Sequence, residues 1–159
     1  ALAVALMKYR GFKEQDFASF HPGGVLGKKL FVKIKDLMRT DALPIINTQT
    51  TLKEAVVAMS EGKLGTVLIV DEKEKFIAIL SDGDLRRALM KKDFSLDHLA
   101  IDYAGKKPKS YSNTELLASD ALEIIENDRI QLLPITNEAG NILGVLHIHD
   151  LINAGIKSK

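Results

Sequence analysis

The sequence predicts an α/β (α+β) fold in which one unit of strands and helices occurs twice. A shift of 66 residues aligns two segments of the chain without a gap from about position 52 onward. Under this shift Asp84-Leu85 coincides with Asp150-Leu151, and apolar positions coincide with apolar positions. Self-similarity at a fixed period is typical of a repeated supersecondary unit. Since each copy has an apolar sheet face, we expect the two copies to pack together with pseudo-two-fold symmetry.

The first copy has the pattern helix, strand, turn, strand, helix. Residues 51–54 form a capping-box pattern, and the helix that follows should end near Gly62. The mostly β-branched run 66–70 predicts a strand buried on both faces, and 76–80 predicts a second strand that makes a hairpin with it. Acidic residues then occupy the first turn of a closing helix, where they stabilise its positive end.

The second copy repeats this order. Its elements are expected at 118–126, 132–136, 142–146 and 148–154, with a turn at 137–141 and a connector at 93–109. We therefore expect three parts of the chain: a separate segment at 1–31, a first module at 32–92 and a second module at 93–156.

Composition excludes several classes of function. The 22 Lys and Arg residues nearly balance the 21 Asp and Glu residues, so no overall charge attracts nucleic acid or an anionic membrane. No apolar run approaches the roughly 18 residues that would span a bilayer. The chain has no cysteine, which fits a reducing compartment. We expect a cytoplasmic protein with no nucleic-acid or membrane partner.

Two closing motifs connect the repeat to a known family. The first copy closes on Ser81-Asp82-Gly83-Asp84-Leu85-Arg86-Arg87 and the second on His147-Ile148-His149-Asp150-Leu151. A β-α-β-β-α order that ends on a strand, a Ser/Thr-x-x-Asp turn and a helix resembles the CBS module, over about residues 32–156. The resemblance implies a tandem CBS pair that binds a nucleotide between its modules, with the Ser/Thr and Asp of each motif at the ribose and phosphates.

The residue types of the first motif suit that role. Ser81 and Asp84 flank a helix start, where free backbone N–H groups favour a phosphate, and the Asp carboxylate can accept ribose hydroxyl hydrogen bonds. Arg86 and Arg87 can add positive charge near the phosphate. The alternative is purely structural: the acidic residues cap a helix and the arginines lie on a solvated face.

The second motif has histidines where the first has Ser81 and Gly83. His147 and His149 lie two residues apart at a strand end, and on an extended backbone both would point to one face. With only Asp150 as a third candidate, a structural zinc site lacks ligands, and no metal is expected. Contact with the ligand, with an affinity that depends on pH, is the favoured interpretation, and plain packing is the alternative.

Residues 1–31 resemble a different family. Ala1 to Met7 followed by His21-Pro22-Gly23-Gly24-Val25-Leu26-Gly27 is similar to the helical end of the SIS (sugar isomerase) domain of D-arabinose 5-phosphate isomerases, which carry a CBS pair directly after it. The resemblance implies that His21 helps complete the active site, but only in the full-length parent. The sugar-phosphate loop and the acid–base carboxylate would precede Ala1, so we expect no isomerase activity from this chain alone.

Two functions remain open at this point. The first is a regulatory module that senses a nucleotide or a CMP-linked sugar for an isomerase of Kdo biosynthesis, in the lipopolysaccharide or capsule pathway, with no required cofactor. The second is a structural dimerisation element without ligand, because the motifs depart from a uniform Thr-x-x-Asp pair and Ala78 stands where Gly144 stands in the other copy. Either function is compatible with a dimer, which we expect.

Overall fold

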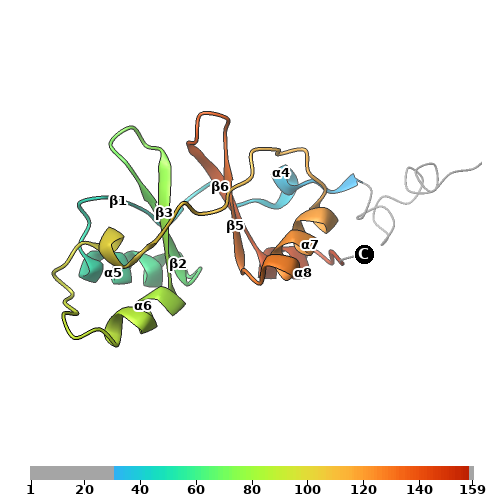
Figure 1. Ribbon diagram of the computed structural model, residues 1–159. Coiled ribbons are helices and arrows are strands. Elements are labelled where there is room, and N and C mark those ends of the chain that lie inside the picture. The colour runs from blue at the N-terminus through green and yellow to red at the C-terminus, as the bar shows by residue number, and fades with distance from the viewer. Residues whose placement is uncertain (1–30, 158–159) are drawn as a thin grey trace, which may run out of the picture. The chain divides into compact units, whose positions relative to one another are not determined.

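The computed structural model describes residues 31–157 (Figure 1). The predicted isomerase tail, including His21, lies outside the described residues. The chain divides into two compact units: a helical unit, with the chain up to Met38, Thr114–Gln131 and Leu146 onward, and a sheet unit, with Arg39–Asn113 and Leu132–Val145. Each unit therefore contains segments of both copies of the repeat.

The sheet unit contains a four-stranded sheet. Its strands are β1 (Ile45–Asn47), β2 (Thr66–Val70), β3 (Phe76–Ser81) and β4 (Gly105–Lys106), in that order. Strand β1 runs parallel to β2, whereas the β2–β3 and β3–β4 pairs are antiparallel. Helix α5 (Leu52–Gly62) makes the crossover that the parallel pair requires, and α6 (Asp82–Leu89) follows β3. The predicted hairpin is confirmed.

The first turn of α5 explains where this helix begins. The Thr51 hydroxyl accepts a hydrogen bond from the Glu54 backbone N–H (3.3 Å), and the Glu54 carboxylate accepts one from the Thr51 N–H (3.0 Å). This capping box satisfies donors that the helix itself cannot satisfy. The helix ends at Gly62, and Lys63 adopts the left-handed conformation that terminates it (φ 55°). The sequence predicted both ends of this helix correctly.

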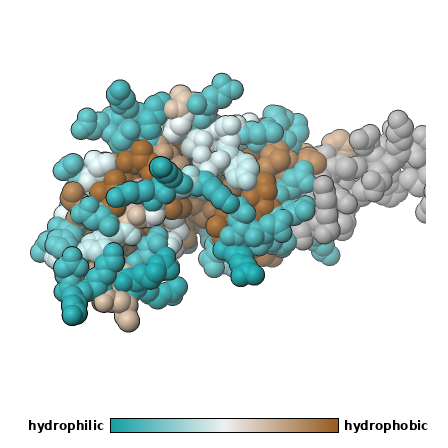
Figure 2. Space-filling model, viewed as in Figure 1, coloured by the Kyte–Doolittle hydropathy of each residue, from teal (hydrophilic) through white to brown (hydrophobic). Residues whose placement is uncertain are grey.

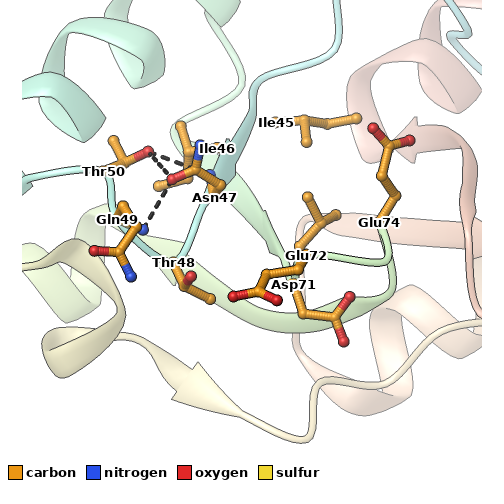
Figure 3. A pocket seen from close by; sticks show the side chains of 10 residues that line it. Ile45, Ile46, Asn47, Thr48, Gln49, Thr50, Asp71, Glu72 and Glu74 are labelled. Atoms are coloured by element: carbon orange, nitrogen blue, oxygen red, sulfur yellow. Dashed lines mark hydrogen bonds between the residues drawn. The ribbon is translucent and has the colours of Figure 1, made fainter.

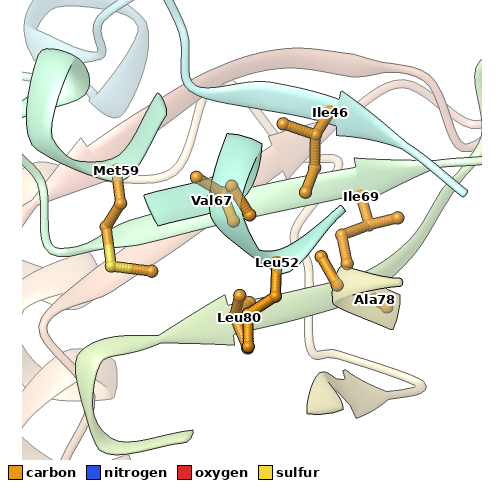
Figure 4. Packing of buried hydrophobic residues seen from close by; sticks show 9 residues of the cluster. Ile46, Leu52, Met59, Val67, Ile69, Ala78 and Leu80 are labelled. Carbon is orange, nitrogen blue, oxygen red and sulfur yellow. The ribbon is translucent and has the colours of Figure 1, made fainter. Parts of the chain in front are cut away.

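Strand β2 is buried on both of its faces, as predicted. On one face, Val67 and Ile69 pack with Leu52 and Leu80 in a cluster that α5 covers (Figure 4). On the other face, Leu68 packs against apolar residues of β5 (Leu132–Thr136) and β6 (Ile142–His147). Helices therefore cover one face of the four-stranded sheet, and the second hairpin covers the other.

Backbone pairings recur after 66 residues with the partners exchanged. Adding 66 to one partner and subtracting 66 from the other turns one observed pairing into another. The bridge Thr51↔Leu99 corresponds in this way to Lys33↔Leu117, and the pair Ile79↔Gly105 corresponds to Arg39↔Val145. The bridge Lys75↔Asn141 corresponds to itself. Each pair lies within one unit. Exchange of partners is the pattern that a two-fold relation between the repeats produces. The repeat also extends further toward the N-terminus than the alignment from position 52 indicated.

The helical unit consists of α4 (Ile34–Leu37), α7 (Ala118–Asp128) and α8 (Ile148–Asn153). Ile34 is fully buried, and α7 contacts both α4 and α8. No side chain caps the N-terminus of α7. Instead, the backbone N–H of Ala118, its first residue, donates to the Val32 carbonyl at 2.8 Å. No helix within residues 31–157 has the length and apolar character needed to cross a membrane.

The predicted connector 93–109 is more ordered than expected. It contains a short 3-10 helix, η1 (Ala100–Tyr103), and the edge strand β4. Conversely, the second copy has only an isolated bridge, Tyr111↔Ile135, where the first copy has β1. Elements of two to four residues carry little periodicity, and pairing with residues distant in the sequence stabilises them.

Candidate functional site

The first motif is a closed hydrogen-bond ring at the start of α6. Ser81 is the N-cap residue, and its hydroxyl oxygen accepts from the Asp84 backbone N–H at 3.3 Å. Asp84 Oδ2 in turn accepts from the Ser81 backbone N–H and from the Ser81 hydroxyl, each at 3.0 Å. The two predicted residues are thus brought together, three positions apart, by the geometry of the cap.

Arg87 contacts the other oxygen of the same carboxylate. Its Nη2 donates to Asp84 Oδ1 at 2.6 Å, with side-chain exposures of 72% for Arg87 and 19% for Asp84. Both oxygens of Asp84 therefore have donors. Arg86 is exposed. The structure thus supports part of the structural alternative, because Asp84 does cap the helix. The two arginines also differ: Arg87 forms an ion pair with Asp84, and Arg86 lies exposed.

Gly65 is a residue of this site that the sequence analysis did not identify. It has a left-handed backbone (φ 67°), and its carbonyl accepts from the Asp82 N–H at 3.0 Å. A Cβ at this position would lie 2.8 Å from Asp82 Oδ2. The left-handed backbone of the residue before β2 favours glycine, and the exposed carboxylate of Asp82 would have to move aside for a larger residue. A glycine directly before a predicted buried strand was the available signal.

The second motif lies at the start of α8, in the helical unit. His147 is the N-cap residue and is only 6% exposed, and its Nδ1 accepts from the His149 N–H at 3.1 Å. The two imidazole rings stack, with 5.0 Å between centroids and 24° between planes. Asp150 occupies the first turn, as Asp84 does in α6.

We expected His147 and His149 to lie on one extended backbone, and this expectation was wrong. His147 ends β6, but His149 belongs to the first turn of α8, so the segment is not extended. The rings approach because the chain turns into the helix after residue 147. Within the described part of the chain, no three His, Cys, Asp or Glu side chains are grouped so as to hold a metal ion.

A separate hollow of about 520 Å³ lies where β1 and β2 end, and no motif residue lines it (Figure 3). Asp71, Glu72 and Glu74 bring three carboxylates to its wall. On the opposite side, Asn47 Oδ1 accepts from the Gln49 N–H at 2.8 Å and holds the loop after β1 in a tight turn. Like charge disfavours a phosphate here, so the hollow does not suit a nucleotide.

The CBS domain family model matches residues 34–91 and 113–157. These two stretches contain both closing motifs, each at the end of a hairpin. The chain belongs to the CBS domain family.

The similarity extends to particular proteins. The chain is 46% identical over 157 residues to an uncharacterized protein of Helicobacter pylori, with 99% of this chain and 47% of that protein covered. It is 38% identical over 157 residues to the arabinose 5-phosphate isomerase KdsD of Pseudomonas aeruginosa, with 98% of this chain and 48% of that protein covered. The chain thus spans about half the length of these relatives, and its CBS pair is of the kind found in KdsD-like proteins.

A solved structure shares the fold. The structure of CBSX2 in complex with AMP superposes with a TM-score of 0.69 at 18% sequence identity, covering 78% of this chain and 96% of that one. At this identity the likeness shows the fold alone. The tandem-module α+β architecture predicted from the repeat is confirmed.

Proposed function

We propose that this chain is the regulatory part of a longer D-arabinose 5-phosphate isomerase, and that it senses a nucleotide or a nucleotide sugar. The observation that carries the proposal is the hydroxyl–carboxylate pair of Ser81 and Asp84 at the start of α6, repeated in position by His147 and Asp150 at α8. The match to the CBS family, the similarity to KdsD and the AMP bound to CBSX2 support it.

The chemistry of the first motif fits an anionic ligand with a ribose. The carboxylate of Asp84 accepts hydrogen bonds from hydroxyl groups, as it already does from Ser81 (3.0 Å). The first turn of α6 directs backbone N–H groups outward, and Arg86 and Arg87 add positive charge nearby. In the second motif, His147, His149 and Asp150 take the corresponding positions.

Catalysis belongs to the parent protein in this proposal. The parent interconverts D-ribulose 5-phosphate and D-arabinose 5-phosphate, and His21 completes its active site. Because the product leads to Kdo, which is activated as a cytidine nucleotide, a CMP-linked sugar is the proposed feedback signal in lipopolysaccharide or capsule synthesis in the cytoplasm. An effector alters activity only if it binds two states of the assembly unequally, with a typical coupling of about 1–3 kcal/mol.

Calorimetry on the chain with AMP, CMP and a CMP-linked acid sugar tests ligand sensing. We expect at least one of them to bind, and Asp84→Ala and Asp150→Ala to weaken it. Asp93→Ala is the matched control, because Asp93 is exposed, lies beyond α6 and carries the same charge. If none of the ligands binds, or if both motif variants bind as the parent does, nucleotide sensing is wrong.

Kinetics of the full-length enzyme with His21→Ala tests the catalytic part: turnover should fall while nucleotide binding is retained.

A dimerisation element is the second candidate function, and exposed apolar side chains favour it. Val57 on α5 is 53% exposed, Leu89 on α6 is 58% exposed, and Met90 directly after α6 is 85% exposed. The space-filling view shows hydrophobic residues at the surface among the charged ones (Figure 2). Analytical ultracentrifugation at about 10–100 μM, where weak dimers form, should give a dimer that Leu89→Asp weakens. A monomer under these conditions would exclude this role.

A further inference from the structure

The Asp84 carboxylate already has three donors, and one of them is a charged side chain. The Ser81 backbone and hydroxyl occupy Oδ2, and the Arg87 guanidinium occupies Oδ1 at 2.6 Å. The Ser81 contacts belong to the cap and hold the start of α6. The Arg87 contact does not, because it reaches back from the next turn of the helix. Arg87 is therefore the donor that can leave without opening the cap.

A ligand that donates both of its ribose hydroxyl groups to Asp84 needs the oxygen atom that Arg87 holds, because Ser81 already occupies both acceptor sites of Oδ2. Its hydroxyl groups would donate to the Asp84 carboxylate, and Oδ1 is the oxygen outside the cap. A neutral nucleoside that takes this oxygen displaces the guanidinium and breaks an ion pair. It offers no anion in return, so the lost contact reduces its affinity.

A phosphorylated ligand is different, since it brings its own anion. Guanidinium groups bind phosphate through paired hydrogen bonds. The Arg87 side chain is 72% exposed and therefore has room to move. Gly83 has no side chain that could restrict this movement, whereas an added Cβ at Gly83 would stand 3.4 Å from Arg87 Nη1. Arg87 can then exchange one anion for another, and the ion pair is not lost.

We propose that Arg87 is a specificity-determining residue that makes the first motif select phosphorylated ligands over neutral nucleosides, by releasing Asp84 only in exchange for a phosphate. This inference rests on the proposed nucleotide sensing and specifies its ligand class. It concerns the first motif alone: 66 residues later Asn153 stands in place of Arg87 and Ile152 in place of Arg86. The second motif has no cation at these positions with which to make the same exchange.

The test compares AMP with adenosine as probes, by calorimetry in an Asp150→Ala background that reports the first motif. In Arg87→Met the competitor is gone while the apolar stem remains. Adenosine should bind about two- to fivefold more tightly, the range expected from the loss of one exposed ion pair. AMP should bind more weakly. The ratio of the affinity for AMP to the affinity for adenosine should therefore fall, because both affinities change in the direction that lowers it. Lys92→Met removes the same charge from an exposed position nearby and should leave that preference unchanged.

Each other outcome has a definite meaning. If Arg87→Met weakens AMP and leaves adenosine unchanged or unbound, Arg87 only contacts phosphate, and the exchange is wrong. If neither affinity changes, the Arg87–Asp84 pair is a surface contact of the helix, and the inference fails while nucleotide sensing stands. If neither ligand nor any other nucleotide binds the parent chain, nucleotide sensing itself is wrong, and this inference fails with it.

Discussion

The first and second motifs occupy the same position in the repeat but differ in chemistry. Both lie where the second strand of a hairpin turns into a helix, and both place Asp in its first turn. The first helix is capped by a hydroxyl, from Ser81, and the second by an imidazole nitrogen, from His147. A cap needs only an acceptor of the right reach, so the fold tolerates either. In the proposed nucleotide sensing, a ligand would meet different side chains at the two motifs.

The strand that precedes each motif shows a second difference. Gly65 stands before β2 and Gln131 before β5, and the carbonyl of each accepts from the first residue of the closing helix, at 3.0 and 2.8 Å. The backbone bond is the same in both copies. Only Gly65 has a left-handed backbone and approaches a carboxylate. The first copy therefore depends on a glycine where the second does not.

The largest effect is expected where the two copies should be alike. Leu80 and Leu146 correspond in the repeat and are both fully buried. Leu80→Ala and Leu146→Ala should each lower the free energy of unfolding by about 2–5 kcal/mol, because each leaves a cavity in a packed core. Urea denaturation measures this, and Ile152→Ala, at a side chain that is 54% exposed, should stay within about 0.5 kcal/mol. A large cost in only one copy would contradict their equivalence.

A smaller and one-sided effect is expected at the strand starts. Gly65→Ala should lower the free energy of unfolding by about 1–3 kcal/mol, because alanine is strained at this left-handed backbone. Gln131→Ala should be nearly neutral, since this side chain is exposed. Equal costs at the two positions, measured by the same denaturation experiment, would mean that the left-handed backbone of the first copy does not favour glycine.

The hairpin turns offer a change that should stabilise the protein. Glu74 has a left-handed backbone (φ 62°), and the corresponding residue of the other copy is Gly140 (φ 89°). Glu74→Gly should raise the free energy of unfolding by about 0.5–1 kcal/mol, because it relieves strain at the cost of some flexibility in the unfolded chain. Gly140→Ala should have the opposite effect. Thermal denaturation of both variants checks the signs, and a destabilising Glu74→Gly would show that the turn is held by the side chain.

The smallest effect depends on pH and is expected in the helical unit. Hydrogen bonds from Lys33 and then Lys35 lower the pKa of Glu115 from 4.5 to about 2. A lowered pKa means that the contribution to stability is fully present above pH 4.5 and is lost as the pH falls through about 2. All three side chains are exposed, so salt should weaken the effect.

The difference in melting temperature between the parent and Glu115→Gln measures this contribution. It should be constant above about pH 5 and shrink toward zero below, which follows from the ordinary carboxyl pKa. Under the 66-residue shift, Gln49 corresponds to Glu115. Leu99 and Ile101 correspond to Lys33 and Lys35. Gln49→Glu should therefore show no comparable pH dependence. A difference that keeps its full size at pH 2 would mean that Glu115 acts through packing.

The sequence by itself determined the features that depend on near neighbours. Period, hairpins and helix ends follow from short-range rules, and the capping box at Thr51 and the end of α5 at Gly62 were predicted correctly for this reason. The motif residues Ser81 and Asp84 were also found together, because they lie three positions apart at the first turn of a helix. Family membership followed from the same local patterns, repeated at a constant distance.

Only the tertiary structure decided what these residues contact. It brought the carbonyl of Gly65 to the backbone N–H of Asp82, and it packed Leu68 of β2 against Leu132 and Val145 of the second copy. It gave Gly65 a left-handed backbone beside the first turn of α6, and it formed η1 and β4 in a segment with no evident pattern. Such contacts join groups whose separation depends on how the chain is packed, and packing is a property of all the buried surfaces together.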